Sequence, residues 1–261
     1  MARLLAVFAL AALSLPLPAL AADLAGHRAL YRLTLDPQSG SAVQSAEGTM
    51  AFEVLDACDG WAVRQRLALK MIARDGQAND LVSEYATFES KDGLTLRYRL
   101  RQSSQGAVSS EISGEATLER AGGPGIARYT LPTEDTRPLP PGTLFPMAHT
   151  MAALAAARRG ERIMTAPLFD GTNDDGVQDS TTTILSAAPA RPVDRFPALS
   201  ALASWRMNVA FFAVASATGA PDYEVTLRYW ENGVADELRM NFGDFAVDGK
   251  MEKFELVPGG C

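Results

Sequence analysis

Apolar and polar residues alternate one by one along most of this chain. Alternation with a period of two places one set of side chains in a core and the other in solvent, which is typical of strands in an antiparallel sheet. The sequence therefore predicts a mainly β fold. The clearest runs, with apolar residues at every second position, are 29–35, 50–54, 94–100, 223–229 and 238–242.

Short glycine-containing dipeptides separate the strand-like runs. Asp-Gly and Asn-Gly tolerate the positive φ that tight hairpin turns require, so they predict a meander of consecutive antiparallel strands. Roughly seven strand-like runs precede residue 146 and roughly six follow residue 161. The predicted turns are Asp59-Gly60, Asp75-Gly76, Asp92-Gly93, Asn232-Gly233 and Asp248-Gly249.

One stretch departs from the β pattern. Leu131–Pro146 is rich in proline and is expected to form a rigid connection. The alanine-rich stretch 146–159 behind it predicts a helix, because Pro146 suits a first turn and arginines suit a last turn. This helix is apolar around most of its circumference, which indicates burial on several sides. A second proline-rich connection is expected over 188–199.

The first residues have the pattern of an export signal. Met1–Ala21 has one early basic residue, a short apolar run and small residues at its end. The apolar run is too short to span a bilayer stably, although a retained N-terminal anchor is an alternative. Cleavage of the signal is expected near Ala21, and the remainder, 22–261, is expected to form one exported, soluble domain. Its two β halves, about 22–131 and 161–261, would be joined by the proline-rich crossover and the helix.

The chain has two cysteines, Cys58 and Cys261. An even number of cysteines in an exported chain normally indicates a disulfide, and a bond between these two would tie the last residue to the first quarter of the chain. It would close a loop of about 200 residues and contribute up to roughly 5 kcal/mol. Two free thiols, or a bridge between molecules through Cys261, are the alternatives.

Charge and motifs exclude several function classes. The net charge is −7 and the basic residues form no cluster along the sequence, which disfavours a nucleic-acid partner. The chain contains no nucleophile elbow, phosphate-binding glycine loop or zinc spacing, so we expect neither an enzyme nor a cofactor. The acidic loop with Asp170, Asp174 and Asp175 is a weak candidate for binding Ca²⁺; a solvated loop between strands is the simpler interpretation.

The histidines are His27 and His149. A histidine in a largely apolar helix is more often a hydrogen-bonded core residue than a general base. The alternative function is an envelope hydrolase that uses His149 with the Asp170–Asp175 loop, which requires these side chains to meet in one cleft.

Aromatic residues are concentrated in the C-terminal half. They form either ordinary core or the lining of an apolar cavity on the concave side of a curved sheet. The candidates for a ligand cavity are Trp205, Phe211, Phe212, Tyr229 and Phe242, together with His149.

Several short stretches, in order and spacing, resemble a bacterial family named after the cell-envelope integrity protein EipB. The resemblance covers nearly all of the chain after the export signal. The matching stretches are 27–31, 46–50, 58–61, 139–143, 145–149, 169–171, 223–227, 231–235, Asp244-Phe245 and Cys261.

The resemblance implies a periplasmic β-spiral, a broken barrel of about fourteen strands with a central helix. It also implies a disulfide between Cys58 and Cys261, and a non-enzymatic role in envelope integrity under stress. A lipid, a lipopeptide or a lipoprotein would bind in the concavity of the spiral, and a periplasmic protein of tetratricopeptide repeats is an expected partner. The resemblance supplies no catalytic residues.

Overall fold

A computed structural model describes residues 24–38, 43–213 and 219–260 of the chain. The first half contains β1 His27–Leu35, β2 Val43–Asp56, β3 Gly60–Ala73, β4 Ala78–Ser90, β5 Thr95–Ser104, β6 Ala107–Leu118, β7 Gly125–Leu131 and β8 Asp135–Leu139. The helix α1 Pro146–Arg158 follows. The second half contains β9 Ile163–Leu168, β10 Gln178–Ala188, a short 3-10 helix at Pro197–Leu199, β11 Ser204–Ala213, β12 Tyr223–Trp230, β13 Ala235–Asn241 and β14 Ala246–Leu256.

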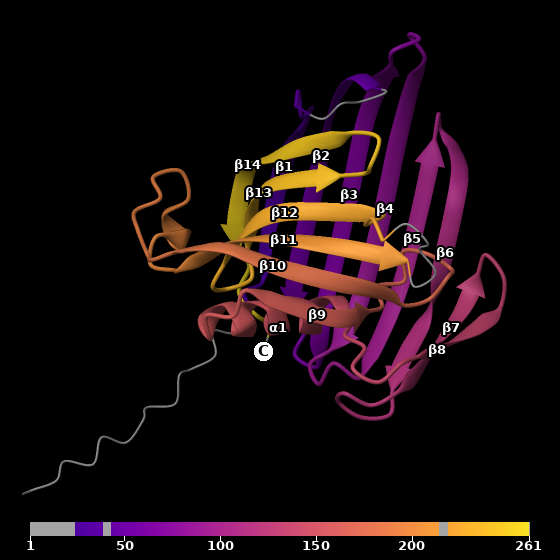
Figure 1. Ribbon diagram of the computed structural model, residues 1–261, viewed down its shortest axis with the longest axis vertical. Helices are drawn as coiled ribbons and strands as arrows, with labels where there is room; N and C mark the ends of the chain where they lie inside the picture. Colours follow the sequence, from indigo (N-terminus) through magenta and orange to yellow (C-terminus); the bar gives the residue numbers. More distant parts are fainter. Residues whose placement is uncertain (1–23, 39–42, 214–218, 261) are drawn as a thin grey trace, which may run out of the picture.

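All fourteen strands belong to one antiparallel sheet, in the order β8-β7-β6-β5-β4-β3-β2-β1-β14-β13-β12-β11-β10-β9. Each half is a meander of consecutive strands, and the two meanders join where β1 pairs with β14. The strands β8 and β9 remain at opposite edges, so the sheet is an unclosed spiral. It curls so that β10–β13 lie in front of β2–β5, with α1 at one end (Figure 1). The predicted broken barrel of about fourteen strands with one helix is confirmed.

The predicted alternation of buried and exposed positions is present in the strands. In β1, Ala29, Tyr31 and Leu33 are buried while Arg28 and Arg32 are exposed. Buried side chains from the same face of the other strands form two core clusters. The larger cluster joins β1–β3 to α1 and β10–β14, and the smaller one joins β5–β7 to Phe145 and Phe169. We call the core-facing side of the sheet its inner face and the opposite side its outer face.

Most of the predicted turns are present, but Asp248-Gly249 is not a turn. Gly76, Gly93 and Gly233 have φ values of 86°, 68° and 81° in hairpin turns. Gly249 lies inside β14, where an added Cβ would be 3.0 Å from the Leu238 Cβ atom. Close packing, rather than a turn, therefore accounts for this glycine. The chain reverses at Gly243, with a φ of 84°.

The prediction of a rigid proline-rich connection over Leu131–Pro146 was incomplete, because this segment also contains the strand β8. Pro138 lies within this strand and pairs with Ile126 of β7. Proline lacks an N–H, and an edge strand tolerates it because one side of the strand needs no partner. The helix matches its predicted range to within one residue and buries six side chains, Met147, His149, Ala153, Leu154, Ala156 and Ala157.

The C-terminal segment lies close to the turn that carries Cys58. The Val257 nitrogen donates to the Gly26 oxygen at 2.8 Å, and the Gly260 nitrogen lies 3.5 Å from the Asp56 oxygen. Cys58 lies two residues after Asp56, in the turn between β2 and β3, and has a positive φ of 68°. Cys261 and the export signal Met1–Ala21 lie outside the described residues, so the disulfide to Cys261 and the cleavage near Ala21 stay predictions. Among the helices described, none is long and apolar enough to cross a membrane.

Candidate functional site

A buried carboxylate holds the first turn of α1. The Glu89 side chain, 1% exposed, reaches from the inner face of β4 to the start of the helix. Its Oε2 atom accepts a hydrogen bond from the Met147 nitrogen at 2.7 Å, and its Oε1 atom accepts one from the Ala148 nitrogen at 2.8 Å. These nitrogens otherwise have no partner within the helix, and a negative charge suits the positive end of the helix dipole. Burial raises the pKa of Glu89 to about 7, although both hydrogen bonds act to lower it.

His149 is buried on α1 and lies beside a serine. Its Nε2 atom is 3.1 Å from the Ser180 Oγ atom, and Ser180 donates its proton to the Ala166 oxygen at 2.7 Å. A serine hydroxyl has one proton, so His149 must be the donor in the contact with Ser180. Burial also lowers the pKa of His149 to about 4. A histidine that donates to the serine does not activate it, and this geometry does not support the hydrolase alternative.

The acidic loop after β9 is a packing element. The Asp170 Oδ1 atom accepts hydrogen bonds from the Thr172 nitrogen at 2.9 Å and the Thr172 hydroxyl at 2.7 Å. The Asp170 and Asn173 carbonyl oxygens accept hydrogen bonds from Tyr85 and Tyr129 on the inner face. The described residues contain no group of three or more His, Cys, Asp or Glu side chains that could hold a metal ion. The weak metal candidates Asp170, Asp174 and Asp175 therefore do not form such a group.

The enclosed cavity beside α1 is small. It holds about 70 Å³ and is lined in part by His27, Phe52, Thr150 and Tyr229. This is room for about two water molecules rather than an acyl chain. Burial lowers the pKa of His27, and its Nε2 atom has no hydrogen-bond partner among the described residues.

The aromatic candidates are not gathered around this cavity. Tyr229 lines it, and Trp205 is the cross-strand partner of Tyr229 on the inner face. Phe211 shares that face, whereas Phe212, the next residue of β11, points to the outer face. Phe242 is 37% exposed. It belongs to a row of ring contacts that runs through Phe211, Tyr223, Phe242 and Phe245 near the far ends of β11–β13.

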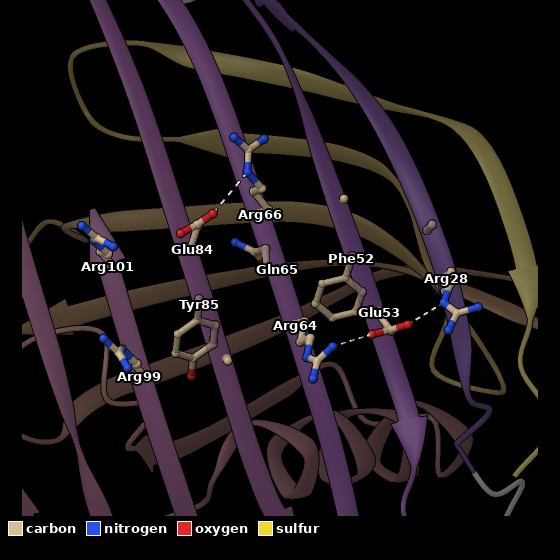
Figure 2. Close-up of a pocket in the computed structure, with 13 residues that line it drawn as sticks. Arg28, Phe52, Glu53, Arg64, Gln65, Arg66, Glu84, Tyr85, Arg99 and Arg101 are labelled. Carbon is tan, nitrogen blue, oxygen red and sulfur yellow. Dashed lines mark hydrogen bonds and ion pairs between the residues drawn. The ribbon is translucent and has the colours of Figure 1, made fainter. Parts of the chain in front are cut away.

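A much larger hollow, of about 550 Å³, lies across the outer face of β1–β5 (Figure 2). We call it the outer hollow. Exposed alanines, Ala51 and Ala86, give it a shallow floor between long charged side chains. Figure 2 shows its charged side chains rising from neighbouring strands. These are Arg28, Glu53, Arg64, Arg66, Glu84, Arg99 and Arg101.

Reasoning from the sequence missed both the outer hollow and Glu89. The arginines come from three strands and are spread from residue 28 to residue 101, so they form no cluster in the sequence. The available signal was position: Arg97, Arg99 and Arg101 alternate with apolar residues, which places all three on one exposed face. By the same rule Glu89 falls on the inner face with Tyr85 and Thr87, and a lone carboxylate there needs a partner.

The sequence profile of a family described as EipB-like matches residues 18–258 of the chain. The chain belongs to the EipB-like family. The cell envelope integrity protein EipB of Brucella abortus is 27% identical to this EipB-like chain over 246 residues, which cover 92% of the chain and 87% of the relative. A crystal structure from Brucella abortus, described as a β-barrel-like protein of a domain of unknown function, superposes on it with a TM-score of 0.82. That match has 27% identity and covers 91% of this chain and 100% of the other.

Proposed function

We propose that this EipB-like chain is a non-enzymatic periplasmic protein that supports envelope integrity by binding an envelope component or a partner in the outer hollow. The relative named as a cell envelope integrity protein supports the biological role. The observation that carries the location is the volume of the outer hollow, about 550 Å³, against about 70 Å³ for the cavity beside α1. Another hollow of about 530 Å³ lies along β11–β14.

The outer hollow has the size of a ligand site. Its volume of about 550 Å³ falls within the range of small-molecule pockets. A second hollow of about 470 Å³ continues across the outer face of β1–β4 and includes Arg32, Glu47 and Lys70. The inner side, in contrast, packs two core clusters and α1 around a cavity of about 70 Å³. Binding on the outer face requires no opening of the core.

A complementation experiment tests this proposal. A strain that lacks the gene would receive the natural chain, an Arg64→Gln/Arg101→Gln variant, or a control Arg120→Gln/Arg191→Gln variant that changes exposed arginines outside the hollow. Survival in detergent would be scored at equal periplasmic protein levels. We expect the first variant to fail and the control to protect the cells. Full protection by the Arg64→Gln/Arg101→Gln variant would contradict the proposal.

A second candidate function is capture of an apolar ligand, a lipid, lipopeptide or lipoprotein acyl chain, at the aromatic row. The exposed Phe242 ring, stacked on Phe245 with 5.0 Å between centroids, favours it. Native mass spectrometry with lipid extraction, on protein purified from its own periplasm, tests this candidate. A lipid that co-purifies with the natural chain and is lost in a Phe242→Ser variant would support it. A lipid-free mass would count against it.

A protein partner fits the same outer-face proposal. The family resemblance suggests a periplasmic protein of tetratricopeptide repeats, and such a partner would require an exposed surface of this chain. Crosslinking in intact cells followed by mass spectrometry checks this: the expected result is a crosslink from Lys70 or Lys91, which lie on the half of the sheet that carries the outer hollow. Crosslinks restricted to lysines of the second half, Lys250 and Lys253, would contradict it.

A further inference from the structure

One row of side chains crosses the outer hollow from strand to strand. In this row Arg28 of β1 pairs with Glu53 of β2, and Glu53 pairs with Arg64 of β3. Arg64 then pairs with Ala86 of β4, which pairs with Arg99 of β5. The charges alternate until Ala86, where a methyl group stands between two arginines.

The next row shows what such a position holds elsewhere in the same sheet. There Arg66 of β3 and Arg101 of β5 are both cross-strand neighbours of Glu84 on β4. The Glu84 Oε1 atom lies 3.3 Å from the Arg66 Nε atom. Glu84 and Ala86 are two residues apart and share one face of β4, so the two positions have equivalent surroundings. Of these two positions on β4, the one at residue 84 carries a carboxylate between two arginines and the one at Ala86 does not.

Of the two arginines beside Ala86, Arg64 is weakly paired within the protein, whereas Arg99 has a close partner at 2.6 Å. Arg64, with a side chain 76% exposed, reaches Glu53 only at 4.0 Å, and Glu53 already accepts a 2.5 Å hydrogen bond from Arg28. Arg99 is 64% exposed and pairs with Glu111 on the side away from Ala86. Within the part of the chain that the structure describes, Arg101 has no ion pair at all. The outer hollow is lined by five arginines and two glutamates. Two further glutamates, Glu111 and Glu255, pair with its arginines from outside the lining, so a small local excess of positive charge remains in an otherwise acidic protein.

We propose that the space above Ala86, between Arg64 and Arg99, is a binding site for a phosphate group. The backbones of β3 and β5 are about 10 Å apart, so two long arginine side chains can converge on one anion above the methyl group of Ala86. A guanidinium donates two parallel hydrogen bonds to an oxyanion, and a phosphate has enough oxygens to accept from both sides and from Arg101. This site identifies the ligand class of the outer hollow and rests on the proposed function.

A substitution that places a carboxylate of the protein itself in the site tests the proposal. An Ala86→Glu variant would place a carboxylate between Arg64 and Arg99, as Glu84 is placed in the next row. The matched control is Ala78→Glu, on the same face of the same strand, where the cross-strand neighbour on β3 is Ile72. Binding of inorganic phosphate would be measured by calorimetry at fixed ionic strength. We expect Ala86→Glu to weaken it by about tenfold or more and Ala78→Glu to leave it within about twofold.

The source of the phosphate is distinguished by a second probe. Co-sedimentation with vesicles of phosphatidylglycerol would be compared with vesicles of phosphatidylcholine for the same three proteins. Phosphatidylglycerol binding that Ala86→Glu abolishes would identify a lipid headgroup, and phosphate binding alone would identify a free or soluble phosphate compound. An Arg64→Gln/Arg99→Gln variant, expected to lose the same binding, serves if Ala86→Glu does not fold.

Two results would overturn the site. One is no binding of either probe by the natural chain; the other is equal loss in Ala86→Glu and Ala78→Glu, which would show a general charge effect. The complementation assay separates this proposal from the broader one. If the purified Ala86→Glu variant loses phosphate binding but still protects cells from detergent, the phosphate site is supported and its part in envelope integrity is contradicted.

Discussion

Buried polar side chains around α1 have structural tasks. Glu89 replaces the side-chain cap that Phe145 cannot provide, and His149 donates to a serine whose own proton is committed to a backbone oxygen. A buried polar group without a partner costs about 1–3 kcal/mol. These two residues therefore stabilise the helix in its place, and burial causes their altered pKa values.

Glu89 makes stability depend on pH. Its pKa of about 7 in the folded protein exceeds its ordinary value of 4.5, so the folded state holds a proton that the unfolded state has lost between these values. The free energy of unfolding should therefore fall as pH rises from about 4.5 to about 7, by at most about 3 kcal/mol, and then level off. In urea unfolding, the free energy of unfolding of the natural chain should fall relative to that of Glu89→Gln between pH 5 and pH 8.

The control for this experiment is Glu119→Gln, which alters an exposed carboxylate in a turn. It should preserve the natural pH dependence. The buried histidines change stability with pH in the opposite direction to Glu89. Because the pKa of His149 is lowered, the free energy of unfolding decreases as pH falls below about 6.5. Comparing the variants removes this shared contribution. An identical pH dependence in Glu89→Gln and the natural chain would show that Glu89 does not titrate in this range.

At the scale of single elements, most of the fold could be predicted. Alternation identifies strands wherever one face is buried, and proline with alanine identifies α1. The failures have local causes. Gly249 looks like a turn residue because an Asp-Gly pair is ambiguous until the packing beside it is known, and β8 was missed because an edge strand tolerates proline. The sequence could not predict that the arginines of the outer hollow lie together, because their proximity depends on the register of five strands.

Gly249 provides a prediction for packing within β14. A side chain there would meet the Leu238 Cβ atom at 3.0 Å and the Leu33 Cδ2 atom at 3.2 Å. We expect Gly249→Val to lower the free energy of unfolding by about 1–3 kcal/mol, as overpacking of a core does. The control is Gly259→Val, where an added Cβ would make only ordinary contacts of 3.7 Å or more. Chemical denaturation of both variants checks this; equal stability would contradict the packing role.

At the scale of the whole molecule, the first and last strands hold the spiral together. The pairing of β1 with β14 joins the two meanders, and the segment after β14 continues to Gly26 and Asp56. The edges β8 and β9 stay apart, although the loop of Asp170 packs on inner-face tyrosines of the first half. A covalent tie at the chain end would strengthen the junction on which both halves depend.

The predicted disulfide can be tested through this junction. Cys58→Ser and Cys261→Ser should each lower the melting temperature, and the double variant should be no worse than either, because all three lose the same bond. The loss should correspond to at most about 5 kcal/mol, the chain-entropy value for a loop of about 200 residues. Unchanged melting temperatures in all three would show that no stabilising bond forms.

Photocrosslinking in living cells from single positions on the two sides of the sheet distinguishes the outer hollow from the inner side as the binding surface. A photoreactive amino acid would replace Ala51, on the floor of the outer hollow, or Phe242, in the aromatic row. Met151, exposed on α1, serves as the control. We expect a specific adduct from position 51 and none from position 151. Adducts from position 242 with none from position 51 would contradict it and place the binding surface on the inner side.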